Sequence, residues 1–276
     1  MFPRPMNASA PLLLLAPRMT DDSKAIWKAA LDLGWSIQRI QGWRVPEELL
    51  GTHQPLVIYG EPLFAEAVAD QMDLVLLEPS LDWLTNLPRE YLQRDIELMS
   101  LAQARRQPNK AFVKPADGKI FDPKVYSSGA ELPGDDLVDA DIPVLRSGIV
   151  DFRLEIRCFV QERRLVTLSP YWRNDQLAQN EQGLWTFLDD EEAAARIFAG
   201  QVLADPCVSL PPACTLDIGR LTDGSWAIIE ANPCWGAGLY GCAPELVLNI
   251  LGSAILPQTK IVAEHRPWIS ARRQSK

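Results

Sequence analysis

Histidine is scarce in this chain, and the cysteine groupings that bind zinc are missing. The sequence contains two histidines, His53 and His265, and neither lies in a recognisable motif. Its five cysteines form no CxxC pair. These absences disfavour a hydrolase with a histidine-based triad and a zinc hydrolase. An odd number of cysteines without a metal motif predicts reduced thiols rather than a disulfide framework.

Long hydrophobic runs and excess positive charge are missing as well. No stretch approaches the roughly 20 apolar residues of a membrane-spanning helix, and the run Leu12–Leu15 is too short for a signal sequence. The formal net charge of −9 disfavours broad binding to nucleic acid or anionic membranes. We therefore expect a cytoplasmic protein with neither as a partner. Residues 1–10 and 271–276 are predicted to be disordered.

Short apolar runs alternate with helical patterns in the first third of the chain. This alternation predicts βαβ units and a small parallel sheet. The first run is followed by APRMTDDS, which contains neither GxGxxG nor GxxxxGK[ST], so no dinucleotide site is expected there. The predicted strands are 12–16, 35–40, 56–59 and 74–77, and the predicted helices are 23–33 and 62–72.

Pro88 precedes a predicted long helix at 89–106, and the composition changes after that helix. In the run 153–160, polar and apolar residues alternate strictly, which predicts a strand with one polar face that carries Glu155 and Arg157. A solvated sheet face is the simpler explanation of that pattern. The other predicted elements are strands at 111–115, 125–128, 143–146 and 165–171 and helices at 190–204 and 244–251.

A hairpin signal lies between two further strand-like runs, 214–221 and 225–231. They are joined by Asp223-Gly224, a dipeptide typical of a two-residue type I′ turn. If these two residues form the loop, Thr222 pairs with Ser225, and paired residue numbers sum to a constant.

That register places Asp217 directly opposite Glu230, with Asn232 on the same face. Facing carboxylates repel each other, so we expect a cation between them. Two carboxylates and an amide oxygen are hard ligands that suit Mg²⁺. The alternative is a solvent-facing hairpin with incidental acids, which the apolar neighbours disfavour.

Other charged residues could complete a phosphate-binding site. Lysine and arginine neutralise phosphate charge, while the acid–acid–amide set would hold Mg²⁺ against phosphate oxygens. Such a combination is typical of phosphoryl transfer. The candidates beside the three oxygen donors are Lys114, Lys119, Glu155, Arg157 and Arg220.

The segments FVKPADGKIFDPKVY, EIRCFV and DIGR…EANPCWGAGLYGC, in this order, resemble the ATP-grasp superfamily. Within it, they are similar to the clade marked by two arginines and a lysine. The likeness covers about residues 88–251. It implies an α+β ATP-grasp fold of two α+β subdomains over residues 88–255. A small α/β parallel-sheet domain at 1–87 would precede it, and a tail at 256–276 would follow.

The resemblance also implies a role for each matching residue. Lys114 and Lys119 would bind the phosphates of ATP, the second from a loop at 116–122, and Glu155 would lie near the ribose. Backbone groups of Val144, Leu145 and Arg146 would contact the adenine. Arg157 and Arg220 would be catalytic, and Asp217, Glu230 and Asn232 would bind Mg²⁺. Many members carry an earlier ATP-binding lysine, for which this chain offers only Lys110 or Arg94.

The implied activity is the ATP- and Mg²⁺-dependent joining of a small-molecule or peptide carboxylate to an amine. It would proceed through an acyl phosphate and release ADP and phosphate. A kinase of the same fold that acts on a small acceptor is one alternative. A nucleotide-binding module without turnover is another, which the metal set and Lys114 disfavour. The sequence specifies neither the two substrates nor the oligomeric state.

Overall fold

The computed structural model describes residues 10–52 and 54–270. His53 lies outside these ranges, and so do the two segments expected to be disordered, apart from Ala10. Within the described residues, no helix combines the length and the apolar character that crossing a bilayer requires.

The N-terminal part forms a three-stranded parallel sheet in the order β2-β1-β3, in agreement with the predicted alternation of strands and helices. Strand β1 is buried along its whole length, as expected of the middle strand of a covered parallel sheet. Thr20 caps α1 and forms a capping box with Ser23. The elements are β1 (Leu12–Leu15), α1 (Asp21–Asp32), β2 (Ser36–Arg39), β3 (Leu56–Tyr59), α2 (Pro62–Gln71) and β4 (Leu74–Leu76).

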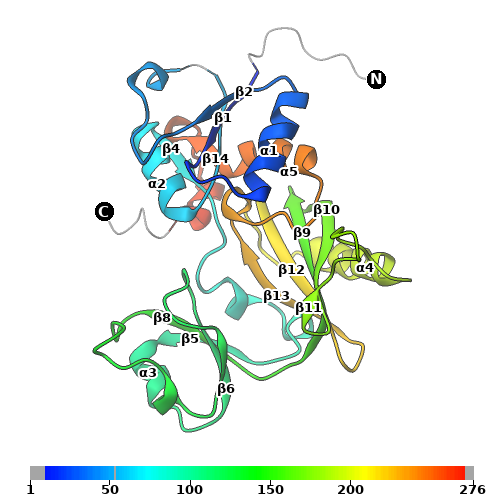
Figure 1. Cartoon of the computed structure of the whole chain (residues 1–276). Helices are drawn as coiled ribbons and strands as arrows, with labels where there is room; N and C mark the ends of the chain where they lie inside the picture. Colours follow the sequence, from blue (N-terminus) through cyan, green and yellow to red (C-terminus); the bar gives the residue numbers. More distant parts are fainter. Residues whose placement is uncertain (1–9, 53, 271–276) are drawn as a thin grey trace.

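The last part of the chain returns to this N-terminal domain (Figure 1). Helix α5 (Pro244–Ala254) lies beside α1, and its apolar residues join the core of the parallel sheet. Strand β14 (Ile255–Pro257) pairs antiparallel with β4, and a bridge joins Leu77 to Ile269. The segment expected to be a tail therefore packs against the N-terminal domain as far as it is described.

The middle of the molecule is a five-stranded antiparallel sheet, the central sheet, in the order β11-β10-β9-β12-β13. Even-numbered residues of β9 and β12 form a core with α4, whereas odd-numbered residues face the other way. Both predicted hairpins are present. The elements are β9 (Phe152–Gln161), β10 (Arg164–Arg173), β11 (Gln176–Leu177), α4 (Glu191–Ala204), β12 (Ala213–Leu221) and β13 (Trp226–Asn232).

Residues 96–147 form a separate lobe around a four-stranded sheet in the order β5-β8-β6-β7. One face of this sheet packs on α3 in a core of its own, which includes Leu101, Val113 and Val144. The elements are β5 (Ile96–Ser100), α3 (Leu101–Arg105), β6 (Ala111–Pro115), β7 (Lys124–Tyr126) and β8 (Pro143–Ser147).

The predicted long helix at 89–106 is wrong. The segment contains a 3₁₀ turn, Arg89–Tyr91, then β5 and the short helix α3. Five residues of β5 pair with β8, which outweighs the helical spacing of the apolar residues. Ser100 then begins α3 in a capping box with Gln103, so the helix starts where the predicted helix was to continue.

Figure 1 shows the N-terminal domain above the central sheet and the lobe below it, on the side of β13. Two short segments outside helices and strands connect the lobe to the rest: residues 92–95 enter it and residues 148–151 leave it. The remaining 3₁₀ turns are Glu47–Leu49, Trp83–Asn86, Gly129–Glu131, Cys234–Gly236, Gln258–Lys260 and Ala263–Trp268.

Gly219 allows β9 and β12 to lie close together where it pairs with Glu155. A Cβ at this position would clash with the ring of Phe152 and lie 2.9 Å from the carbonyl oxygen of Leu154. We expect Gly219→Ala to lower the free energy of unfolding by about 1–3 kcal/mol, because backbone must shift to make room. Denaturant unfolding measures this change.

Gly200→Ala is the matched control, since a Cβ at Gly200 in α4 would have no atom within 4 Å. It should raise the free energy of unfolding by about 0.5–1 kcal/mol, because alanine favours a helix interior. Equal effects of the two substitutions would contradict the packing argument.

Candidate functional site

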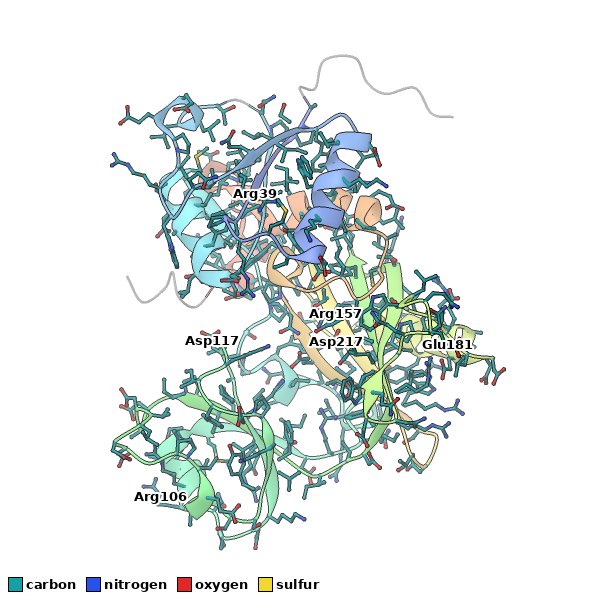
Figure 2. The ribbon with its side chains drawn as sticks, viewed as in Figure 1. Arg39, Arg106, Asp117, Arg157, Glu181 and Asp217 are labelled. Carbon is teal, nitrogen blue, oxygen red and sulfur yellow. The ribbon has the colours of Figure 1, made fainter. Side chains whose placement is uncertain are left out.

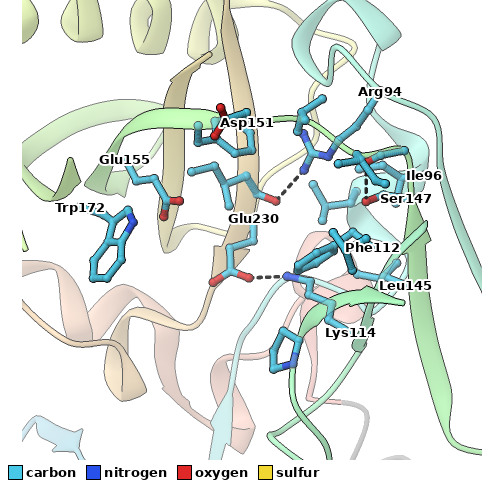
Figure 3. Close-up of a pocket in the computed structure, with 18 of the residues that line it drawn as sticks. Arg94, Ile96, Phe112, Lys114, Leu145, Ser147, Asp151, Glu155, Trp172 and Glu230 are labelled. Carbon is cyan, nitrogen blue, oxygen red and sulfur yellow. Dashed lines mark hydrogen bonds and ion pairs between the residues drawn. The ribbon is translucent and has the colours of Figure 1, made fainter. Parts of the chain in front are cut away.

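A cavity of about 430 Å³ lies between the lobe and the central sheet (Figure 3). Its lobe wall is largely apolar, with Ile96, Phe112 and Leu145, and Lys114 projects from it. The facing wall carries acids and aromatic rings. The residues of that wall include Glu155, Tyr171, Trp172, Ile229 and Glu230.

Strand register explains the lobe wall. Phe112 pairs with Ser147 and Lys114 with Leu145, so these four side chains share the face toward the cavity. Val113, between them, points the other way into the lobe core. The strand predicted at 111–115 thus carries Lys114 on an apolar surface that faces the cavity.

Four charged residues form a continuous row beside this cavity, which we call the charged row. Arg157, Asp217 and Glu230 lie directly opposite one another on β9, β12 and β13. Lys114 reaches from the lobe to the Oε2 atom of Glu230, as Figure 3 shows. Anions and cations balance along the row, so the repulsion between the two facing acids is offset by a cation at each end.

The Arg157–Asp217 pair is the buried part of the row (Figure 2). Arg157 donates through Nε to Oδ1 at 2.9 Å and through Nη2 to Oδ2 at 2.6 Å. The two residues are only 7% and 1% exposed. Burial alone would lower the pKa of Arg157, but the carboxylate of Asp217 raises it above its usual value. The guanidinium therefore stays charged at any physiological pH.

Asp217 faces Glu230 as predicted, although the turn differs from the one expected. Gly224 donates to the carbonyl of Leu221, and Leu221 pairs with Ser225, so the predicted Thr222–Ser225 pair is wrong. The pairing therefore runs one residue out of the predicted register until Ile229. There a bulge inserts one extra residue into β13 and restores the predicted register.

Glu230 holds its negative charge firmly. Burial opposes ionisation, but the Lys114 ammonium and a hydrogen bond of 2.8 Å from Asn232 Nδ2 lower the pKa of Glu230 to about 2. Glu155, farther along the same face, behaves in the opposite way. Burial and the nearby charges of Asp217 and Glu230 raise its pKa, against a hydrogen bond from Tyr171.

Aromatic rings connect the charged row to the glycine-rich loop Cys234–Cys242. Tyr171 stacks on Tyr240 of this loop with 4.9 Å between ring centroids. The Arg157 guanidinium carbon lies 4.8 Å from the centroid of the Tyr240 ring. Arg157 also donates to the carbonyl of Gly238 at 3.0 Å, and the Tyr59 hydroxyl donates to that of Ala237 at 2.8 Å. The loop therefore lies between the charged row and the N-terminal domain.

Several predicted site residues lie elsewhere. Lys119 is exposed on the loop after β6. Val144 and Arg146 sit in the middle of β8, whose backbone pairs with β5 on one side and β6 on the other. Leu145 does line the cavity, with its side chain. Arg220 is three residues from Asp217 on one strand, so it faces α4 beside Trp226 and not the charged row.

Sequence reasoning missed other residues of the cavity. The segment 148–151, which follows the lobe, lines the cavity, and so do Phe112 and Trp172. Arg94, named from the sequence only as a substitute for an earlier lysine, lines it too. A bulge at Tyr171 turns Trp172 onto the face of Glu155, opposite which it lies. Phe112 could have been found, because it alternates with Lys114. The bulge and the connecting segment left no sequence signal.

The predicted metal ligands Asp217, Glu230 and Asn232 share one face of the β12–β13 hairpin. Two carboxylates and an amide oxygen fit Mg²⁺ in donor chemistry, and one of the three residues, Glu230, lines the cavity. Asp217 already shares both carboxylate oxygens with Arg157. The described part of the chain contains no group of three or more histidine, cysteine or acidic residues placed to hold a metal. Glu230 also accepts on both oxygens, from Lys114 and from Asn232, but it lines the cavity, whereas Asp217 is buried, so Glu230 is the more accessible donor.

Removing the cation from the buried pair should be costly. We expect Arg157→Met to lower the free energy of unfolding by about 3–5 kcal/mol, because it leaves the Asp217 carboxylate buried without a partner. Arg196→Met is the matched control, since Arg196 and Glu192 form an exposed pair one helical turn apart. That control should change stability by about 0.5 kcal/mol or less. Unfolding in guanidinium chloride measures the stability of both variants. Similar losses of stability would contradict the prediction that the buried pair matters more than the exposed one.

The low pKa of Glu230 predicts a pH-dependent contribution to stability. Its folded-state pKa of about 2 is below the ordinary value of 4.5, so the carboxylate stabilises the fold above the ordinary value. That contribution is lost as the pH falls toward 2. The stability difference between wild type and Glu230→Gln should therefore be largest near neutral pH and shrink in acid. Unfolding curves at a series of pH values measure it.

Glu48→Gln, at an exposed glutamate of the first 3₁₀ turn, serves as the control and should show a small difference at every pH. If the stability difference between wild type and Glu230→Gln does not change with pH, Lys114 does not hold the Glu230 charge.

The chain is similar to known proteins in sequence and in fold. Residues 91–250, more than half of the chain, match the model of an ATP-grasp domain family, the second family of the clade named for two arginines and a lysine. A search of curated proteins finds no match. Among solved structures, D-cycloserine synthetase DcsG has a TM-score of 0.54 at 14% identity, over 88% of this chain and 99% of that one.

Two further solved structures are similar. The ATP-grasp ligase PsnB, complexed with a minimal precursor, has a TM-score of 0.51 at 13% identity, over 89% of this chain and 100% of that one. D-alanine–D-alanine ligase from Bacillus anthracis, complexed with ATP, has a TM-score of 0.51 at 12% identity, over 89% and 97%. At identities this low the likeness establishes the fold, which agrees with the architecture expected from the sequence.

Proposed function

Because the chain belongs to the ATP-grasp domain family of the two-arginine, one-lysine clade, we propose that it is an ATP-dependent ligase. It joins the carboxylate of a small molecule or peptide to an amine through an acyl phosphate. The observation that carries this proposal is the pairing of Lys114 with Glu230 across the cavity, in line with Asp217 and Arg157. Lys114 on the sheet of the lobe meets Glu230 and Asp217 on the central sheet, and we place the triphosphate and its metal ion between them.

The nucleotide base fits the apolar end of the cavity. Ile96, Phe112 and Leu145 offer an apolar wall, while the backbone of β8 is occupied by pairing with its neighbours. We therefore assign the contacts with the base edge to the segment 148–150 rather than to 144–146. Glu155, beside Trp172 on the opposite wall, is placed for the ribose hydroxyls.

The phosphates would lie at the charged end, where Lys114 exchanges its contact with Glu230 for phosphate oxygens. Glu230 and Asn232 would then hold Mg²⁺, with Asp217 beside them. When bound, the metal neutralises charge on the transferred phosphoryl group. The low pKa of Glu230 means that this ligand needs no deprotonation before it binds.

Arg157 is placed to act between the nucleotide and the acceptor. Its guanidinium touches Asp217 on one side and the glycine-rich loop on the other. A carboxylate oxygen of the substrate attacks the γ-phosphorus, which forms the acyl phosphate and releases ADP. The amine then attacks the carbonyl carbon, loses a proton and displaces phosphate. Arg157 orients the carboxylate and its phosphorylated form by charge-assisted hydrogen bonds.

The reaction is tested by following oxygen atoms. Carboxylates labelled with ¹⁸O are incubated with ATP, Mg²⁺ and a panel of amines, and ADP, phosphate and its isotope content are measured. A ligase releases ADP and phosphate together, and the phosphate carries one ¹⁸O atom from the carboxylate. A phosphorylated acceptor without free phosphate would favour the kinase, and binding of ATP without any ADP release would favour a non-catalytic module.

Lys114→Met should raise the KM for ATP in this assay by about 10- to 100-fold, because a hydrogen bond to a charged group is worth about 1.5–3 kcal/mol. Lys110→Met provides the control, since Lys110 is exposed just before β6 and does not line the cavity. Equal effects of the two substitutions would contradict the assignment of the phosphates to Lys114.

A further inference from the structure

Arg94 occupies a position that the proposed function does not use. It lies in the segment that enters the lobe, and its side chain reaches the outer edge of β13 (Figure 3). Its Nη1 atom donates to the carbonyls of Leu92 at 2.8 Å and Ile228 at 3.0 Å, and its Nη2 atom donates to that of Ile229 at 3.3 Å. Its guanidinium carbon lies 5.5 Å from the centroid of the Phe152 ring.

This arginine has no acidic partner among the described residues, whose ion pairs all involve other cations. Burial lowers the pKa of Arg94 to about 10, which still leaves it charged. Arg94 is thus a buried charged group whose three hydrogen bonds all go to backbone carbonyls. Its role therefore depends on the backbone that these carbonyls belong to.

The two carbonyls on β13 belong to consecutive residues, Ile228 and Ile229. In a regular strand, consecutive carbonyls point to opposite edges. One guanidinium reaches both only because the bulge at Ile229 turns them to the same edge. Arg94 therefore fits the bulged form of β13 and would lose one of these bonds if the strand became regular.

The bulge in turn decides where Glu230 lies. β13 is the edge strand of the central sheet, so no neighbouring strand fixes its outer carbonyls. Without the extra residue, the turn register would continue, and Glu230 would shift by one position relative to Asp217. A shift of one residue moves a side chain to the opposite face of the sheet. Glu230 would then leave the cavity and Lys114.

We propose that Arg94 is a positioning residue that holds the Ile229 bulge and thereby keeps Glu230 opposite Asp217 on the cavity face. The consequence for metal binding rests on the proposed function, in which Glu230 is a ligand of Mg²⁺. The competing role is direct contact between Arg94 and the nucleotide, in place of the earlier lysine of related proteins. In that role Arg94 would have to use only the N–H groups that do not bond to carbonyls.

The test uses Mn²⁺ as a spectroscopic substitute for Mg²⁺, with a non-hydrolysable ATP analogue, and measures Mn²⁺ affinity by electron paramagnetic resonance. Arg94→Met should weaken Mn²⁺ binding by about 10- to 100-fold, the usual effect of losing a partner that orients a ligand. Arg94→Lys should recover part of the affinity, because an ammonium can still reach a carbonyl. Arg89→Met, at an exposed arginine of the 3₁₀ turn that precedes this segment, should change nothing.

A double substitution separates the two roles. If Arg94 acts through Glu230, adding Arg94→Met to Glu230→Gln should weaken Mn²⁺ binding no further than Glu230→Gln alone. Losses that multiply would show that Arg94 contacts the nucleotide independently, and unchanged affinity in Arg94→Met would show that it positions nothing. Either result overturns the proposal.

Amide hydrogen exchange without nucleotide or metal supplies a measurement that does not depend on the proposed function. Arg94→Met should speed exchange at residues 228–230, whereas Arg89→Met should not. Unchanged exchange at the bulge overturns the positioning role. If the wild-type protein binds no Mn²⁺–nucleotide, the proposed function fails, and the exchange result still decides the role of Arg94.

Discussion

The balance of charge along the row Arg157–Asp217–Glu230–Lys114 is the constraint on which the rest of the site depends. Two acids on neighbouring strands cannot lie face to face in a buried place unless cations compensate them. One cation comes from the same sheet and is almost fully buried. The other comes from the lobe and reaches across the cavity. The sheet and the lobe are therefore linked by electrostatics at the point where the proposed reaction takes place.

The same row explains why the glycine-rich loop and the N-terminal domain converge here. Arg157 donates through Nη1 to the carbonyl of Gly238 in the loop, and the Tyr59 hydroxyl of β3 donates to the carbonyl of Ala237, one residue earlier. The loop is thus fixed by one residue from each side. The rings of Tyr171 and Tyr240 stack on each other, and both lie against the Arg157 guanidinium. An acceptor that approaches the phosphoryl group would meet surfaces from three parts of the chain.

How much of this could be predicted depends on the range of the interactions involved. Local signals sufficed for the parallel sheet, for both hairpins and for the face shared by Asp217 and Glu230. The latter was correct although the turn was not, because the bulge at Ile229 cancels the error. Simple alternation already separates Arg220 from Asp217, yet the resemblance outweighed it. The segment 89–106 became strand and short helix because pairing with β8, far along the chain, decides its structure.

The lobe has one further consequence, for the mechanics of the molecule. Its core under α3 contains only residues between 99 and 144, and two short segments, 92–95 and 148–151, connect it to the rest. A pivot about these segments would move Lys114 away from Glu230 but would leave Arg157 and Asp217 together, since they belong to one sheet. The two ion pairs therefore respond differently to the same motion. The Lys114–Glu230 pair would separate as the cavity opens, whereas the Arg157–Asp217 pair would stay intact within the central sheet.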